Sequence, residues 1–315
     1  MMENFAVINL GSNSARLTIN QIDDDGAYKE VGRYREFVRL SEDMQLHDNT
    51  LQPAAMDRTI EALKGFKTDY SKLSNVKLRA VATAAVRNAK NKKKFLKRVR
   101  DEIGIELEVI PGTQEAYYDY LGVTETLPLM NCLIMDTGGA STELILVQNR
   151  KANNLISIPM GSVNLTEKYL NPDQISAREL FNMTTGMTQL YNGIWWLRKA
   201  MNLPIVALGG SNRTLAKIQR RKEHFQHFED IHGYRMRNDE VNNVFGEVVS
   251  QNLDGRKKIP GLSKDRADII VGGLIPIVTI ISYLDSDRTV FSQNGLGEGI
   301  LFEELKQLRE EGKIK

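Results

Sequence analysis

Two distant segments of the chain share one pattern: a short apolar run, a loop of small polar residues, and a second strand-like run. In the first segment, Phe5–Leu10 is the apolar run, Gly11–Ser14 is the loop and Ala15–Ile22 is the second run. In the other segment, Asn131–Met135 is followed by a glycine-rich loop and then by Thr142–Val147. Short apolar runs bounded by glycine are typical of buried strands. The repetition predicts a duplicated α/β unit with a hairpin at the start of each half.

The rest of the chain alternates between helical and strand-like periodicity, which favours an α/β fold. The boundary between the two halves is expected near Gly122–Asn131. Helices are expected at 56–73, 91–103, 114–121, 176–201, from 211 onward, 267–284 and 298–311, and further strands at 77–83, 106–110 and 204–208.

Length and composition limit the classes of protein to consider. The chain has 315 residues, enough for two ordinary domains, and 41% of them are hydrophobic, as in globular proteins. The single cysteine, Cys132, excludes an internal disulfide and favours a reducing compartment, so we expect a cytoplasmic protein. The first residues lack a secretory signal, and the most apolar stretch, Ile269–Leu284, is too short to span a membrane. With a net charge of +2, the chain needs a local basic patch to bind a polyanion.

Three loops follow strands and combine small residues with hydroxyl or amide side chains. They consist of Gly11, Ser12, Asn13 and Ser14; of Gly138, Gly139, Ala140 and Ser141; and of Gly209, Gly210 and Ser211. Glycine lets the backbone approach a ligand closely, and successive N–H groups can surround phosphate oxygens. One such loop is commonly only a turn, but three of them in a duplicated pattern favour a phosphate-binding cleft between the halves.

Ordered motifs along nearly the whole chain, from about Val7 to Leu301, make the sequence recognisable. They are VINLGSNSARL (7–17), AVATAAVRNAKN (80–91), PGTQEAYYDYLGV (111–123), IMDTGGASTELILV (134–147), MGSVNLTEKY (160–169), ALGGSNRTLAKI (207–218), RADIIVGG (266–273) and NGLGEGIL (294–301). The chain resembles the exopolyphosphatase/guanosine pentaphosphate phosphohydrolase (Ppx/GppA) family, within the superfamily of actin-like ATPases. The resemblance implies two ribonuclease-H-like domains with a cleft between them, residues 1–123 and 124–297, with the helix at 298–315 packing back on the first.

The resemblance also implies magnesium-dependent hydrolysis of a terminal phosphate, with roles for four residues. Glu115 matches the glutamate taken as the catalytic base, and Arg87 would neutralise phosphate oxygens. Asp136 and Glu143 match the acidic positions that hold the divalent ion. Glu115, Asp136 and Glu143 each have a simpler interpretation when taken alone: a surface glutamate, a loop cap and a solvated strand residue, respectively. The motifs around them favour the functional interpretation.

Four positions depart from the family pattern. Asn9 stands where the family has aspartate; it keeps a coordinating oxygen for a metal but lacks the charge. Gln114 occupies a position where acidic residues are common, and Tyr117 and Gly297 replace arginines. These departures imply a weakened magnesium and phosphate site more than an altered fold.

The resemblance leaves three functions open. The first is an exopolyphosphatase that cleaves the terminal phosphoanhydride of inorganic polyphosphate. The second is hydrolysis of the 5′-terminal phosphate of guanosine pentaphosphate. The third is a regulatory role, in which a catalytically weakened protein binds polyphosphate or nucleotide. The expected cofactor is Mg²⁺, neither DNA nor a membrane is an expected partner, and a homodimer stays open.

Several other features have competing interpretations. His224, His227 and His232 lack acidic or cysteine partners at metal-binding spacing, so they are interpreted as loop residues. The basic run Lys90–Arg100 is interpreted as a solvated helix face; the alternative is that it guides a polyanion toward the cleft. Trp195 and Trp196 are expected to pack in a helix core, since no further aromatic residues suggest a nucleic-acid platform.

Overall fold

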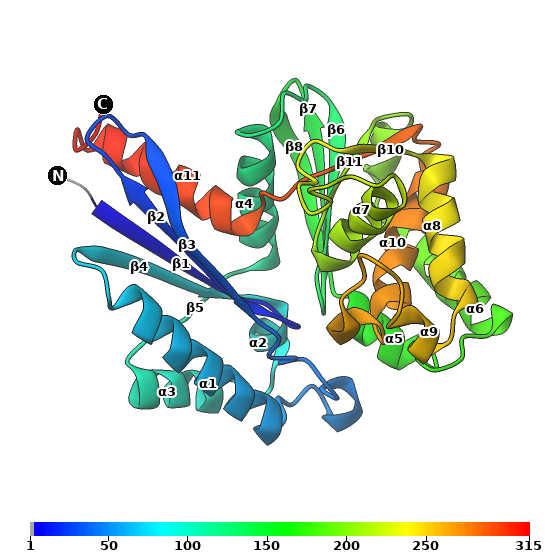
Figure 1. Ribbon diagram of the computed structural model, residues 1–315, viewed down its shortest axis with the longest axis horizontal. Helices are drawn as coiled ribbons and strands as arrows, with labels where there is room; N and C mark the ends of the chain where they lie inside the picture. Colours follow the sequence, from blue (N-terminus) through cyan, green and yellow to red (C-terminus); the bar gives the residue numbers. More distant parts are fainter. Residues whose placement is uncertain (1–2) are drawn as a thin grey trace. The chain divides into compact units, whose positions relative to one another are not determined.

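The computed structural model describes residues 3–315 and divides into two compact units. The first unit consists of Met1–Glu125 together with Leu296–Lys315, and the second of Thr126–Gly295. Each unit is built on one mixed sheet with helices on its faces (Figure 1). The α/β class expected from the alternating periodicity is therefore confirmed.

The sheet of the first unit has five strands in the order β3-β2-β1-β4-β5. Three consecutive strands, β1 (Glu3–Leu10), β2 (Ala15–Ile22) and β3 (Tyr28–Glu36), form an antiparallel meander. The short strands β4 (Val76–Ala82) and β5 (Glu108–Val109) then add parallel to β1. The hairpin expected around Gly11–Ser14 is confirmed.

Helices cover both faces of this first sheet, which explains why β1 is a continuous apolar run. On one face, Ala6, Ile8 and Leu10 pack with α1 (Pro53–Tyr70) and α3 (Lys92–Ile103). On the other face, Phe5 and Val7 pack with α4 (Gly112–Thr124) and α11 (Leu296–Glu310), which lie side by side (Figure 1). The short helix α2 (Ala84–Asn88) follows β4, and one 3-10 turn lies at Gln45–His47.

The sheet of the second unit has six strands in the order β10-β11-β9-β6-β7-β8. It repeats the first design: β6 (Cys132–Thr137), β7 (Thr142–Gln148) and β8 (Lys151–Ile158) form the meander, and β9 (Ile205–Leu208) and β11 (Arg288–Phe291) add parallel to β6. The edge strand β10 (Arg235–Arg237) is antiparallel to β11. The expected duplication of the strand–loop–strand pattern is thus present in both sheets.

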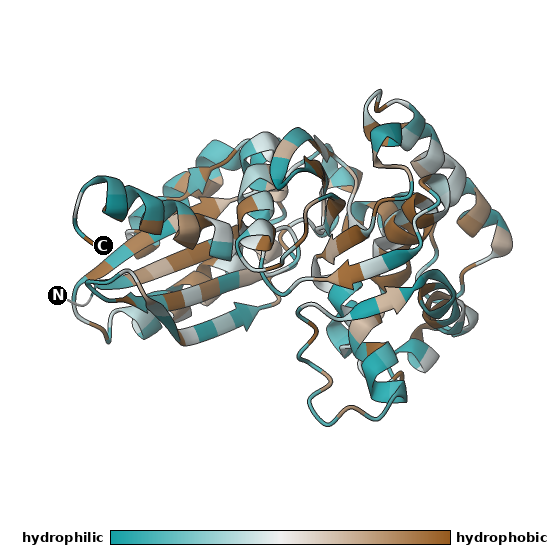
Figure 2. Cartoon of the chain, turned by 90° about the horizontal axis from the view of Figure 1, so that it is seen from above, coloured by the Kyte–Doolittle hydropathy of each residue, from teal (hydrophilic) through white to brown (hydrophobic). Residues whose placement is uncertain are grey.

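The helices of the second unit enclose one large apolar core, to which strands β6, β7 and β9 contribute. They are α5 (Ser162–Tyr169), α6 (Ala177–Asn192), α7 (Gly210–Lys222), α8 (Asn238–Ser250), α9 (Leu253–Arg256) and α10 (Ile270–Tyr283), with 3-10 turns at Leu197–Ala200 and Lys264–Arg266. Figure 2 shows apolar residues concentrated on strands and on the inner sides of helices. Within residues 3–315, no helix combines the length and the apolarity that crossing a membrane requires.

One expectation about packing is wrong. Trp196 is buried, but Trp195 is 76% exposed and lies in the turn after α6. The ammonium group of Lys199 lies 4.8 Å from the centre of the Trp195 ring. The two residues are adjacent in a turn rather than on one helix face, so only one of them reaches the core.

Candidate functional site

The loop after β1 is closed by its own backbone. The N–H of Gly11 donates to the carbonyl of Ser14 at 3.1 Å, and the carbonyls of Ser12 and Asn13 accept from N–H groups of the segment after β3. In the part of the chain that the structure describes, the N–H groups of Ser12, Asn13 and Ser14 have no protein acceptor. Consecutive amides without acceptors form a concavity suited to an anion.

The loop after β6 repeats this geometry in the second unit. The N–H of Gly138 donates to the carbonyl of Ser141 at 2.9 Å, and the N–H groups of Gly139, Ala140 and Ser141 find no acceptor among residues 3–315. Gly161 packs directly on the loop, because a Cβ there would lie 2.6 Å from the nitrogen of Ala140. The two loops predicted from the repeated pattern therefore have the same hydrogen-bonded closure.

The third loop lies at the same edge of the second sheet as the second loop. Strands β6 and β9 are parallel neighbours, so their carboxyl ends meet. Gly209 has φ +89° and ψ 164°, a conformation essentially restricted to glycine, and α7 begins at the next residue. The side-chain amide of Asn212 donates to the carbonyl of Leu208 at 2.6 Å and to the hydroxyl of Thr137 at 3.4 Å. The start of α7 is thereby fixed to the end of β6.

Two carboxylates lie directly opposite each other on adjacent strands of the second sheet. Asp136 on β6 pairs in register with Glu143 on β7, so their side chains share one face. Glu143 is only 1% exposed and accepts a hydrogen bond from the hydroxyl of Ser157 at 2.7 Å. Asp136 lies against Gly209, where a Cβ would be 2.6 Å from Oδ1. Like charges opposite each other repel, and a divalent cation relieves that repulsion.

This carboxylate pair fits Mg²⁺ in chemistry and in number. Magnesium takes oxygen ligands, keeps several waters and is commonly held by one or two carboxylates. Asp136 and Glu143 supply those oxygens, and Ser157 orients one of them, as an outer-shell hydrogen bond does. Larger groups of three or more His, Cys, Asp or Glu residues suited to a metal do not occur among the described residues.

The first unit brings Arg87 and Glu115 together, although they lie far apart in sequence. Arg87 is on α2, directly after β4, and Glu115 is in the first turn of α4. Nη1 of Arg87 donates to Oε2 of Glu115 at 3.0 Å and to the carbonyl of Ile110 at 3.0 Å. The Glu115 side chain is 11% exposed, so this ion pair is largely shielded from solvent. The amide of Thr83 donates to the carbonyl of Leu10, which fixes the start of α2 to the Gly11–Ser14 loop.

Asn9 is the residue before the last of β1. Alternation along the strand places it on the same face as Phe5 and Val7, the face covered by α4. Its Oδ1 is buried and has no hydrogen-bond partner in residues 3–315. A buried acceptor without a partner is costly unless water or a cation occupies it. Asn9 belongs to the first unit, whereas Asp136 and Glu143 belong to the second.

Two of the other three departures from the family pattern, Tyr117 and Gly297, lie in exposed or open positions. Tyr117 is 37% exposed and joins a cluster of rings, 6.3 Å from Tyr118 and 5.9 Å from Tyr120 between centroids. A Cβ at Gly297 would meet no atom within 4 Å. Tyr117 therefore packs against neighbouring rings, and the space around Gly297 is open.

Two residues near the loops of the second unit carry signals that the sequence interpretation left unassigned. Arg266 is 6% exposed, and its guanidinium lies against the start of α7, where a Cβ on Gly210 would be 2.2 Å from Cζ. Its motif, RADIIVGG, is recognisable, but nothing in the motif alone assigns the arginine to this loop. Ser157 lies on β8 and contacts Glu143, a contact that follows only from the strand register.

The three histidines at 224, 227 and 232 lie in the segment between α7 and β10. His232 Nδ1 accepts from the backbone N–H of Gln293 at 3.3 Å, and its Nε2 lies 3.4 Å from the carbonyl of Thr126. His224 and His227 lie in the exposed segment between α7 and β10. Their interpretation as loop residues agrees with this placement.

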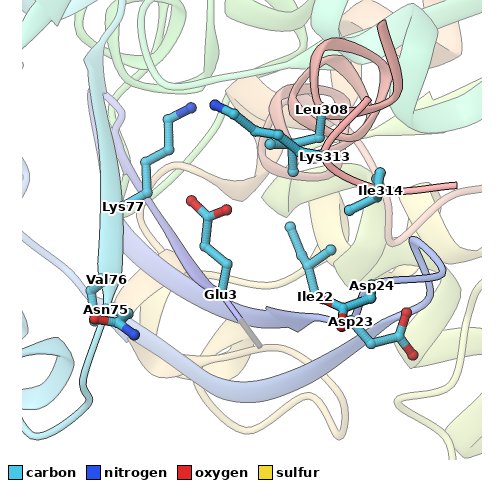
Figure 3. Close-up of a pocket in the computed structure, with 10 residues that line it drawn as sticks. All are labelled: Glu3, Ile22, Asp23, Asp24, Asn75, Val76, Lys77, Leu308, Lys313 and Ile314. Carbon is cyan, nitrogen blue, oxygen red and sulfur yellow. The ribbon is translucent and has the colours of Figure 1, made fainter. Parts of the chain in front are cut away.

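A separate cavity of about 570 Å³ lies at the end of the first sheet where strands β1 and β4 begin, away from the Gly11–Ser14 loop at which β1 ends. Side chains that line it include Glu3, Lys77 and Lys313 (Figure 3). Lys77 is paired with Glu304 at 2.5 Å. The cavity contains none of the predicted site residues, and β1 separates it from the Gly11–Ser14 loop by the length of the strand.

Comparison with known proteins finds curated relatives that are longer than this chain. A bifunctional 3-dehydroquinate synthase/phosphatase of Fusobacterium nucleatum is 29% identical over 95% of this chain and 46% of its own length. A guanosine-5′-triphosphate,3′-diphosphate pyrophosphatase of Vibrio vulnificus is 29% identical over 98% of this chain and 60% of its own length. The chain therefore spans only about half to three fifths of the curated relatives it matches.

A solved structure matches over its full length. The crystal structure of the Aquifex aeolicus member of the Ppx/GppA protein family has a TM-score of 0.78 and 30% identity, and the match covers 98% of this chain and 99% of that chain. This likeness confirms the fold expected from the motifs. The family model of Ppx/GppA phosphatases matches residues 18–308, nearly the whole chain. The chain belongs to the Ppx/GppA phosphatase family.

Proposed function

We propose that the protein hydrolyses the terminal phosphoanhydride of inorganic polyphosphate by attack of water. The observation that carries this proposal is the shielded contact between Arg87 and Glu115 at the carboxyl edge of the first sheet. A carboxylate held in one orientation can orient an attacking water and accept its proton. The adjoining Gly11–Ser14 loop offers three consecutive amides to phosphate oxygens.

Each group has a defined task in this mechanism. Glu115 orients the attacking water and accepts its proton, and Arg87 both positions Glu115 and offers its remaining N–H groups to phosphate oxygens. The loop amides stabilise charge that develops on the phosphoryl oxygens. In the second unit, Asp136 and Glu143 would hold Mg²⁺, which neutralises phosphate charge when bound.

Guanosine pentaphosphate is the second candidate substrate. It is favoured by the Vibrio vulnificus relative, whose name specifies a guanosine-5′-triphosphate,3′-diphosphate pyrophosphatase. The terminal phosphoanhydride is chemically the same in both substrates, so the same base, arginine and loop amides would act on it. The two candidates differ in what lies beyond the cleaved bond, which is a uniform polyanion in one and a nucleoside that carries 5′- and 3′-diphosphates in the other.

The test is release of phosphate from each substrate, with and without Mg²⁺, by the native protein and Glu115→Gln. The substitution preserves size and removes proton acceptance, so we expect turnover to fall by about 10²–10⁴-fold while substrate binding persists. The matched control is Glu125→Gln, an exposed glutamate just after the same helix. Unchanged turnover in Glu115→Gln would refute the assignment of the base. If the native protein releases no phosphate from either substrate but binds them, the regulatory binding function replaces hydrolysis.

A further inference from the structure

Helix α3 begins with three consecutive lysines. Phe95, Val99 and Ile103 are buried and anchor one face of the helix against the core. The lysines at the start of the helix, Lys92, Lys93 and Lys94, are all exposed. We call these three residues the α3 lysine cluster. The helix itself is held by its apolar face, so the lysines are not needed for packing.

The basic residues around the cluster are neutralised by carboxylates, whereas the cluster is not. The neutralised residues are Lys90 by Asp48, Lys97 by Asp101, Arg98 by Asp57 and Glu102, and Arg100 by Asp101 and Glu106. Across residues 3–315, neither Lys93 nor Lys94 has a carboxylate within ion-pair distance, and Lys92 contacts only a carbonyl group.

The position of the cluster is unfavourable for the helix. Cations in the first turn are repelled by the positive end of the helix dipole. Lys93 and Lys97 are like charges four residues apart, as are Lys94 and Arg98, and such pairs destabilise helices. The first turn contains no acidic residue to offset this. A bound anion would remove the repulsion, because helix dipole and lysines both attract negative charge.

The cluster is joined directly to the proposed catalytic arginine. Nζ of Lys92 donates to the backbone carbonyl of Arg87 at 3.1 Å. The guanidinium of the same Arg87 contacts Glu115. Only residues 88–91 separate Arg87 from the cluster in sequence. The side chain of Asn91 fixes this segment: its Nδ2 donates to the carbonyl of Leu51, and its Oδ1 accepts from the N–H of Leu51, both at 3.0 Å.

We propose that the α3 lysine cluster binds the part of a polyphosphate chain that lies beyond the phosphate being cleaved. This inference rests on the proposed function and deepens it by assigning a binding site for the rest of the substrate chain. A linear polyphosphate carries charge at every repeat, so it can meet Arg87 and three further cations in succession. In guanosine pentaphosphate a nucleoside separates the 5′-phosphates from the 3′-diphosphate, so the row of charge is short and interrupted and gains less from successive cations. The cluster therefore favours long polyanions over short triphosphates.

The test uses the full-length chain with the double variant Lys93→Gln/Lys94→Gln. Phosphate release is measured against long-chain polyphosphate and against tripolyphosphate over a range of salt concentrations. The control is Lys29→Gln/Lys151→Gln, which removes the same charge at two exposed lysines without ion pairs in the described chain. Both variants are also compared by thermal unfolding.

We expect kcat/KM for long-chain polyphosphate to fall about tenfold in the cluster variant and to change less than about twofold for tripolyphosphate. The slope of log affinity against log salt should decrease by about 1.4, taking about 0.7 per contact as for single-stranded polyanions. The melting temperature should be unchanged or higher, because the variant relieves repulsion at the helix start. The control should show neither the loss nor the smaller salt slope.

Equal losses on both substrates, or no loss on long chains, would overturn the role of the cluster while hydrolysis itself stands. If the native chain hydrolyses neither substrate, the proposed function fails, and calorimetric titration with long-chain polyphosphate still decides the inference. In that case tighter binding by the native protein than by the cluster variant supports the polyanion surface. Equal binding by both refutes it.

Discussion

Replacing Gly209 with alanine tests how tightly the second unit is built around its carboxylates. A Cβ at this position would lie 2.3 Å from the carbonyl oxygen of Thr137 and 2.6 Å from Oδ1 of Asp136. Both distances are well inside van der Waals contact, and the first involves backbone. The residue also has φ +89° and ψ 164°, which a side chain makes unfavourable whatever space surrounds it.

The expected cost has two parts. The backbone conformation costs about 1–3 kcal/mol for a residue other than glycine. Forcing a methyl group into packed surroundings costs about 1–3 kcal/mol more. Together, Gly209→Ala should lower the free energy of unfolding by about 2–6 kcal/mol, a large part of the roughly 5–15 kcal/mol typical of native proteins. The variant should also need more Mg²⁺ for any activity, because the Asp136 carboxylate has to move.

The measurement is urea unfolding of Gly209→Ala beside Gly246→Ala. Gly246 lies inside α8, and a Cβ there would meet nothing within 4 Å. Alanine is the better helix former, so the control should gain up to about 1 kcal/mol. A Gly209→Ala protein with unchanged stability would mean that the contact with β6 is looser than the structure shows, and the reasoning would be refuted.

The remaining predictions concern the other helix contact and the metal. Gly299→Ala should lower the free energy of unfolding in urea by about 1–3 kcal/mol, because its Cβ would lie 2.0 Å from a backbone oxygen of α4. Gly297→Ala on the same helix is the control: its Cβ would have open space, so its stability should be unchanged or higher. Ser157→Ala removes the hydroxyl that bonds Glu143 and should weaken Mg²⁺ affinity by about 10–100-fold in a titration; unchanged affinity would exclude Glu143 as a ligand. Asn9→Asp should raise turnover at saturating Mg²⁺ and weaken substrate binding without it, and a change in stability alone would show that Asn9 only caps the strand.

Elements with apolar periodicity could be predicted from the sequence, and elements without it could not. Strand β1 and strand β6 are apolar on both faces because helices or loops cover both, and each ends at glycine, which marks the boundary. Strand β3 was not predicted, since nearly all of its residues are exposed and it therefore lacks a period of two. Strand β8 was missed because only its last residue, Ile158, is fully buried, and α5 because its buried polar residues interrupt the apolar pattern. Helix α8 was missed although Val241, Val244 and Val248 recur at helical spacing.

The candidate site was predictable in its residues but not in its contacts. The glycine loops and the two acidic positions follow from local motifs. The hairpin register places Asp136 opposite Glu143, and this register is fixed by a loop whose length the sequence shows. The bond between Arg87 and Glu115 depends on β4 and β5 being neighbours, and β5 is only two residues long, so no local pattern indicated it.

The return of α11 to the first unit has a consequence for synthesis of the chain. The second unit is continuous in sequence and can complete its core once Gly295 has left the ribosome. The first unit cannot, because the face of β1 with Phe5 and Val7 is covered by residues from Leu296 onward. Helix α4 covers part of this face earlier, but the part that α11 covers stays exposed until residues 296–310 have been made. The N-terminal unit therefore finishes folding after the unit that is synthesised later.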